Sequence, residues 1–151
     1  MKVDGDYTMN APREQVFETL MSVGALTGCL PGCERFEDVG GGRYETTLKA
    51  GVAGVRGTFT GAVTLRDPVP PESYTLEMEG SFKGGHVRGV GHITLEDLGG
   101  GKTRVRYNGD AQISGALASV GQRLMQPAAR MMANQFFKCM ESKVGVRSAE
   151  G

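Results

Sequence analysis

The feature that most constrains this chain is a two-residue alternation of apolar and polar side chains. It is clearest over residues 55–65, where every even position carries Arg, Thr or Ala. The odd positions are Val55, Gly57, Phe59, Gly61, Val63 and Leu65. Successive side chains of a β-strand point to opposite faces of the sheet, so the pattern predicts a strand with one apolar and one solvated face.

The same alternation recurs on both sides of this strand. Its predicted inward positions are Val3, Tyr7 and Met9, then Tyr44, Thr46 and Leu48, then Tyr74, Leu76 and Met78, then Val87, Ile93 and Leu95, and finally Val105, Tyr107, Ala111 and Ile113. Glycines at 40–42, 84–85 and 99–101, with residues 51–54 and 68–71, predict the intervening turns, because glycine reaches positive φ easily and proline cannot continue a paired strand. Strands joined by such short turns pair antiparallel.

Two segments show a helical period instead. Residues 10–14 carry an N-cap and a first-turn proline, and they are followed by a short apolar stripe of Val16, Phe17 and Leu20. After Gly115 a long helix is predicted to about Lys143, kinked at Pro127. Its predicted apolar face is Leu117, Val120, Leu124, Ala128, Met131, Met132 and Cys139. The opposite face is Arg123, Arg130, Asn134 and Glu141.

These elements predict an α+β domain with one strand, one or two short helices, six further strands and a long C-terminal helix. A sheet with one apolar face must cover it, and the long helix is the available cover. One helix cannot fill a curved seven-stranded sheet, so we expect a cavity between them. The 151 residues fit one domain, which we place at residues 1–144, with residues 145–151 as a disordered tail.

Charge and terminal sequence narrow the class of protein. Lys plus Arg is 17 and Asp plus Glu is 17, which argues against nucleic acid as the main partner. The opening M-K-V-D-G-D-Y has no apolar run, so we expect no signal peptide. No stretch approaches the roughly 20 apolar residues of a membrane span. We therefore expect a cytoplasmic protein, with peripheral contact at the inner face of the cell membrane as an option.

The cysteines raise a separate question, because Cys29 and Cys33 flank a Pro-Gly pair. Their C-x3-C spacing differs from the C-x-x-C of redox and zinc sites, and no second ligand pair follows. We favour a structural turn, with a disulfide or a metal as the alternatives. Cys139 is expected as a small buried hydrophobe, and three cysteines without secretory context suggest reduced thiols.

No catalytic constellation appears in the sequence. His86 and His92 lie in one predicted strand, about 20 Å apart, so they cannot share a metal. There is no nucleophile paired with a base and no glycine-rich phosphate loop. Only Tyr107 and Gln135 are candidates for acid–base chemistry inside a cavity. We therefore predict no catalytic residues and no metal site.

The inner face remains as the candidate site. Inward glycines at 57, 61, 89, 91 and 109 either bend the sheet or leave room for a ligand. The candidate lining residues are Leu26, Leu30, Leu48, Phe59, Leu76, Met78, Tyr107, Leu124, Met131, Met132, Gln135 and Phe136. A plain core is the alternative. Gln135 would cap a loop backbone or donate to a ligand oxygen.

Basic residues mark the other side of the long helix. Arg123, Arg130 and Lys138 form either a solvated face or a docking site for an acidic partner or anionic lipid.

Several motifs in order resemble one family. They are G-D-Y-T-M-N-A-P-R-E-Q-V-F, C-L-P-G-C-E, V-R-G-T-F-T-G-A-V-T-L, P-P-E-S-Y-T-L, G-G-H-V-R-G-V-G, and G-Q-R-L followed by Q-F-F. Together they resemble the G-subunit family of carbon monoxide dehydrogenase, within the START-like (SRPBCC) superfamily, which has the helix-grip fold. Phe17 stands where an aromatic residue, often tryptophan, is expected, and Pro127 departs from the pattern.

The resemblance implies a non-catalytic accessory protein of aerobic molybdenum-containing carbon monoxide dehydrogenase. Such a protein would bind a hydrophobic quinone, menaquinone or a similar isoprenoid, without a covalent cofactor. It would carry the quinone in electron transfer or link the enzyme to the membrane. In the family, C-L-P-G-C-E leads into the second strand, with no metal or disulfide implied. The alternative is a helix-grip enzyme, cyclase-like or hydrolase-like, acting on a hydrophobic small molecule.

Overall fold

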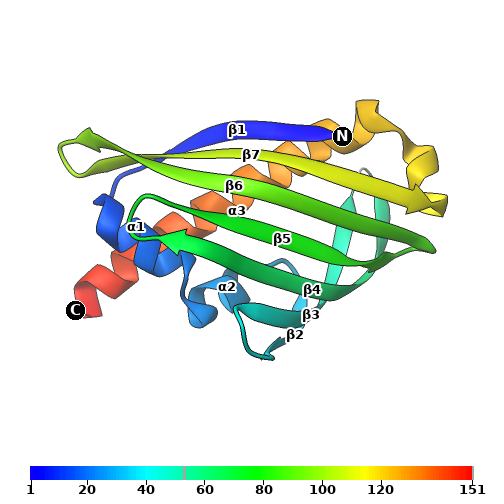
Figure 1. Ribbon diagram of the computed structural model, residues 1–151, viewed down its shortest axis with the longest axis horizontal. Coiled ribbons are helices and arrows are strands. Elements are labelled where there is room, and N and C mark those ends of the chain that lie inside the picture. The colour runs from blue at the N-terminus through cyan, green and yellow to red at the C-terminus, as the bar shows by residue number, and fades with distance from the viewer. Residues whose placement is uncertain (53, 151) are drawn as a thin grey trace.

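The computed structural model describes residues 1–52 and 54–150, and within them seven antiparallel strands curve around a long C-terminal helix (Figure 1). The elements in chain order are β1 (Lys2–Met9), α1 (Arg13–Leu20), α2 (Val23–Cys29), β2 (Cys33–Asp38), β3 (Arg43–Val52), β4 (Val55–Val69), β5 (Ser73–Phe82), β6 (Gly85–Gly99), β7 (Lys102–Gly115), the 3-10 helix η1 (Ala116–Val120) and α3 (Gln122–Glu150). The predicted fold class and order of elements are confirmed.

The sheet is a meander with one long-range pairing. Its order is β1-β7-β6-β5-β4-β3-β2, so β2 to β7 follow one another while β1 joins at the far edge. Gly40–Gly42 and Gly99–Gly101 all have positive φ, as the predicted tight turns require. The predicted turn at 51–54 includes Ala53, which lies outside the described residues, and nothing is described of the Val55 side chain.

The apolar positions of the strands face α3, as the alternation predicts. Tyr74, Ile93 and Tyr107 are directly opposite one another across β5, β6 and β7, and all three are buried. Tyr107 also packs against Phe137 of α3, with ring centroids 5.6 Å apart. Because side chains alternate strictly along each strand, this row identifies the inner face of the whole sheet.

The start of α1 differs from the prediction in detail. The N-cap is Pro12 rather than an earlier residue, and α1 begins at Arg13. The backbone N–H of Asn10 instead donates to Glu141 Oε2 of α3 over 2.8 Å. The predicted apolar stripe is confirmed, since Val16, Phe17 and Leu20 are all buried.

The predicted apolar face of the long helix is correct only in part, since Leu117 is buried and Met132 and Cys139 are half-buried. Leu124 and Met131 are 60% and 58% exposed. The buried positions of α3 are Met125, Phe137, Met140 and Val144. The prediction treated the segment after Gly115 as one helix, whereas Gly121, at φ 84°, separates η1 from α3. Leu117 and Val120 therefore do not share the angular phase of α3, and the inferred face was rotated.

The end of α3 also bears on the predicted domain boundary. The helix continues through Pro127 and ends at Glu150. Residues 145–150 are thus helical and Gly151 lies outside the described residues, while the domain boundary at residue 144 stays a prediction. No helix within 1–52 and 54–150 combines the length and apolar character that crossing a bilayer requires.

The cysteine prediction requires a correction. Cys29 at the end of α2 is bonded in a disulfide to Cys139 on α3, with Cα atoms 5.6 Å apart and 110 residues between them in sequence. Of the three cysteines, all within the described residues, Cys33 is free. The turn at Pro31–Gly32 is as expected. Sequence spacing could not reveal the disulfide, because its partners meet only when α2 packs on α3.

Candidate ligand-binding site

Buried apolar side chains in the described part of the chain form two separate core clusters. The first, at the α1 end of the sheet, contains Met9, Ala11, Val16, Phe17, Leu20, Ala25, Leu26, Cys29, Tyr74, Ile93, Leu95, Val105, Tyr107, Phe137, Met140 and Val144. The second, at the η1 end, contains Leu48, Phe59, Phe82, Leu117 and Met125. The inner face between these clusters is the part of the core where packing is interrupted.

Strand register identifies the residues that occupy this interval. Met78 lies opposite Val63 on one side and Gly89 on the other, and Gly89 lies opposite Ala111. Leu76, two residues before Met78, lies opposite Gly91. We call this set the inner patch: Val63, Leu76, Met78, Gly89, Gly91 and Ala111. It is apolar, and none of its members titrates.

The inner patch is incompletely covered. Met78 points to the inner face, since its Cγ would lie 3.5 Å from a Cβ placed on Gly89. Met78 is nevertheless 39% exposed. Leu76, Gly89, Gly91 and Ala111 are half-buried. The cover is incomplete because α3 packs chiefly against β1, α1 and α2 rather than against β5 and β6.

The inward glycines divide into two kinds. A Cβ at Gly61 would collide with the backbone of Glu79, and one at Gly57 would come within 2.8 Å of Lys83, so these two allow close packing. A Cβ at Gly89 or Gly91 would meet its nearest atom at 3.5 Å or 3.8 Å, which is ordinary contact distance. A Cβ at Gly109 would be tighter, at 3.1 Å. Gly89 and Gly91 therefore leave room above the sheet.

The predicted lining residues are divided among the two clusters, the inner patch and α3. Leu26, Leu76, Tyr107 and Phe136 belong to or pack on the first cluster, whereas Leu30, Leu48 and Phe59 belong to or pack on the second. Met78 is in the inner patch, together with Leu76, which also packs on the first cluster, and Met132 is half-buried on α3. Leu124, Met131 and Gln135 are exposed on α3. The predicted strand residues thus share the inner face but are divided between the two clusters and the inner patch, and part of the helix set lies outside.

Sequence reasoning missed two members of the patch, Val63 and Ala111. Both belong to the predicted inward positions, but the predicted lining set does not include them. The signal that identifies them is the antiparallel register, because both lie in the cross-strand row of Met78. That register depends on the lengths of the turns, which the alternation alone does not give.

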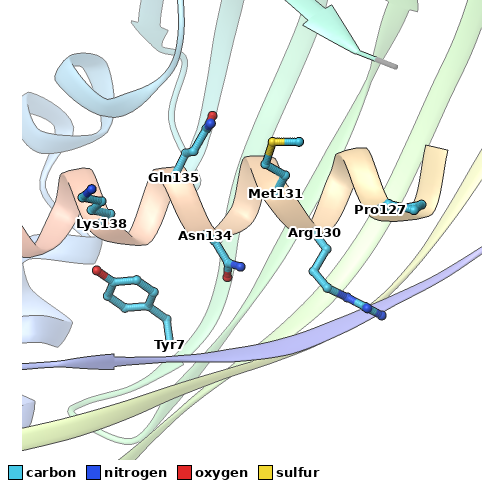
Figure 2. Close-up of a pocket in the computed structure, with 7 residues that line it drawn as sticks. All are labelled: Tyr7, Pro127, Arg130, Met131, Asn134, Gln135 and Lys138. Carbon is cyan, nitrogen blue, oxygen red and sulfur yellow. The ribbon is translucent and has the colours of Figure 1, made fainter. Parts of the chain in front are cut away.

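The exposed side of α3 forms a second surface. An open groove of about 430 Å³ is lined by Tyr7, Pro127, Arg130, Met131, Asn134, Gln135 and Lys138 (Figure 2). Arg130 lies 3.8 Å from Asp4 of β1. The hydroxyl of Tyr7 donates to Glu141 Oε1 over 3.1 Å. Burial is the larger cause and this carboxylate the smaller cause of the raised pKa of Tyr7. We call Arg123, Leu124, Pro127, Arg130, Met131 and Lys138 the outer face of α3.

Polar chemistry near the core is sparse. The buried hydroxyl of Tyr107 has no hydrogen-bond partner among the described residues, and burial raises its pKa while Arg130 acts in the opposite direction. His92 contacts Thr75 over 3.1 Å on the outer side of the sheet. Within the described ranges, no three His, Cys, Asp or Glu residues are arranged to hold a metal. The inner patch can exclude water from an apolar ligand, but it offers no group for proton transfer.

A long helix gripped by a curved antiparallel sheet, with an incompletely covered apolar inner face, is the START-like fold. Several solved structures share this fold. A START superfamily protein from Mycobacterium smegmatis is 13% identical, with a TM-score of 0.68 over 95% of this chain and 97% of that one. An aromatase/cyclase from a Streptomyces species is 17% identical, with a TM-score of 0.69 over 98% and 95%.

More similar is a conserved protein from Geobacillus kaustophilus, which is 28% identical with a TM-score of 0.91 over 96% of this chain and 95% of that one. A search of curated proteins found no significant match. Residues 5–145 match the G subunit of carbon monoxide dehydrogenase (CoxG), and the chain belongs to that family.

Proposed function

We propose that this protein binds a hydrophobic small molecule on the inner patch and carries it without transforming it. The observation that carries the proposal is the incomplete cover of Met78 between two packed clusters. A ligand there would remove apolar surface from water, at about 25 cal/mol for each Å². Because the patch has no charge, affinity should follow the shape and volume of the ligand.

An isoprenoid quinone, menaquinone or a similar molecule, is the ligand class we favour. Membership of the CoxG family supports a role as an accessory protein of a carbon monoxide dehydrogenase. A quinone would accept the electrons of that enzyme. The apolar rows of the inner patch suit a prenyl tail. In this proposal the protein is a non-catalytic accessory that moves quinone between enzyme and membrane.

Contact with the membrane is a separate part of the proposal, and the outer face of α3 supports it. Leu124 and Met131 are largely exposed there, beside Arg123, Arg130 and Lys138. Residues 111–140 contain no Asp or Glu, although the whole chain has 17 of them. Exposed apolar side chains flanked by cations suit the surface of an anionic bilayer.

A helix-grip enzyme remains the second candidate, on two observations. An aromatase/cyclase shares the fold, and Tyr107 has a buried hydroxyl without a partner among the described residues. However, Tyr107 lies over Gly5 of β1, in the first cluster, rather than in the inner patch. An enzyme would need an acid or base at the patch, and its six members provide none.

The binding experiment uses the purified protein and a short-chain menaquinone. Organic extraction with mass spectrometry identifies any co-purified isoprenoid, and titration measures affinity. Gly89→Leu should fill the inner patch and weaken binding by about tenfold or more. Val90→Leu is the matched control, because Val90 is the next residue, faces outward and is 41% exposed. Equal affinity in both variants, or no binding by the parent, would exclude the patch as the site.

A further inference from the structure

The disulfide between Cys29 and Cys139 has no part in the proposed binding site, and it joins α2 to α3. It links the last residue of α2 to a half-buried position in the C-terminal half of α3. Beside it, Cys139 Sγ lies 3.8 Å from the carbonyl oxygen of Gly28. The side chain of Lys143 also lies against Gly28. The covalent bond is therefore the strongest tie between α2 and α3 at this point.

The segment that the disulfide ties to α3 contacts both core clusters. Leu26 belongs to the first cluster, whereas Leu30, just after α2, packs on the second. The segment from Leu26 to Leu30 thus contacts both clusters, and the inner patch on β4–β7 lies between those clusters. In Figure 1, α2 is on the β2–β3 side of α3, opposite the edge that β1 closes.

The segment that contains α2, residues 22–32, is fixed to the rest of the protein at both ends. The N–H of Ser22 donates to Thr19 of α1 over 3.0 Å, and Lys49 of β3 donates to Gly32 over 2.9 Å. A Cβ at Gly32 would collide with the Lys49 carbonyl, so the turn lies directly on β3. Between these two points, α2 is a seven-residue strap, and the disulfide holds its last residue to α3.

We infer that the Cys29–Cys139 disulfide is a redox latch that holds α2 against α3 and limits exchange of the ligand at the inner patch. The role in ligand exchange rests on the proposed function, whereas the control of α2 does not. In the reaction, a dithiol reductant attacks the disulfide and transfers two electrons. The protein gains two thiols, at Cys29 and Cys139, and the reductant becomes a disulfide.

The surroundings of Cys29 and Cys139 favour this thiol–disulfide exchange. Cys139 is half-buried rather than enclosed, so an attacking thiolate has access. The Nζ atom of Lys143 would lie 3.3 Å from a Cβ on Gly28, the residue next to Cys29. A nearby cation stabilises a leaving thiolate and thereby assists reduction. Cys33 is separate, since its Sγ contacts the Arg35 carbonyl at 3.5 Å.

The first test follows α2 directly and needs no ligand. Hydrogen exchange of residues 23–30 is compared in oxidised and dithiothreitol-reduced protein, with thiols counted in both. Reduction should raise the thiol count from one to three and speed exchange in α2 by about tenfold, with β6 and β7 unchanged. Equal α2 protection in the two forms, or three thiols before reduction, would overturn the latch.

The second test follows the ligand, with the fluorescent probe 1-anilinonaphthalene-8-sulfonate. Probe dissociation should be about tenfold faster after reduction, and Cys29→Ser/Cys139→Ser should match the reduced protein under all conditions. Cys33→Ser should still respond to reductant as the parent does. If α2 responds to reduction but the dissociation rate does not, the latch does not control exchange. If neither form binds the probe or menaquinone, the proposed function fails while the hydrogen-exchange result still decides the state of α2.

Discussion

The ring of Tyr107 on β7 lies directly over Gly5 on β1, so that a Cβ at Gly5 would sit 2.7 Å from Tyr107 Cζ. We expect Gly5→Ala to force this ring out of place and to lower the unfolding free energy by about 1–3 kcal/mol. Urea denaturation measures the change. Gly91→Ala is the control, because a Cβ there meets nothing closer than 3.8 Å. A Gly5→Ala protein as stable as Gly91→Ala would contradict the packing of Tyr107.

The hydroxyl of Tyr107 gives a second prediction. It is buried without a partner among the described residues, and an unsatisfied buried polar group costs about 1–3 kcal/mol. Tyr107→Phe should therefore leave the protein as stable as the parent or more stable, with the affinity for menaquinone unchanged. Loss of a chemical activity in this variant, with the fold intact, would favour the enzyme candidate instead.

The orientation of α3 can be tested by a pair of methionines. Met140 is fully buried, and Met140→Ala should lower the unfolding free energy by about 2–5 kcal/mol. Met131 is largely exposed, and Met131→Ala should change it by about 0.5 kcal/mol or less. Both can be measured by urea denaturation. The reverse order of effects would mean that the helix presents the face expected from the sequence.

Reduction of the disulfide should also affect global stability. Because the bond closes a loop with a sequence separation of 110, its removal should lower the unfolding free energy by about 2–4 kcal/mol. Denaturation with and without reductant measures this difference. Cys33→Ser should show the same dependence on reductant, and Cys29→Ser/Cys139→Ser should show none. A parent protein insensitive to reductant would indicate that the two thiols are not joined.

Membrane contact through the outer face of α3 predicts binding to vesicles that contain anionic phospholipid. Lys138→Glu should weaken co-sedimentation about 30-fold, since each cation near such a surface contributes about 1 kcal/mol and the change reverses a charge. Leu124→Ser should weaken it by removing an apolar contact. Arg88→Glu on the outer face of β6 is the charge-matched control. Equal losses for Arg88→Glu and Lys138→Glu would point to net charge rather than this face.

The strands could be predicted because their signal is local. Each inward residue from Phe59 to Leu65 follows from alternation and from its immediate neighbours. The buried face of α3 could not be predicted, because Gly121 interrupts the periodicity on which that prediction depends. A glycine in such a conformation is not distinguished, in sequence, from one that a helix tolerates.

Two features of the candidate site required tertiary structure. The disulfide joins residues that no spacing relates, and Cys33, the nearer neighbour of Cys29, is the one left free. The sequence does not distinguish the inward glycines from one another. The backbone of a neighbouring strand occupies the space beside Gly61, whereas the space above Gly89 is open. Only the relative placement of strands distinguishes these roles.

The pairing of β1 with β7 has a consequence for biosynthesis. Lys2 aligns with Asp110 and Met9 with Thr103, so the first strand waits for about 100 further residues before its partner exists. At a translation rate of about 5–20 residues per second, that delay is roughly 5–20 s on the ribosome. During this time the β1 segment, with its apolar Val3, Tyr7 and Met9, has no strand to pair with. A nascent-chain chaperone that shields this segment should therefore increase the yield of folded protein.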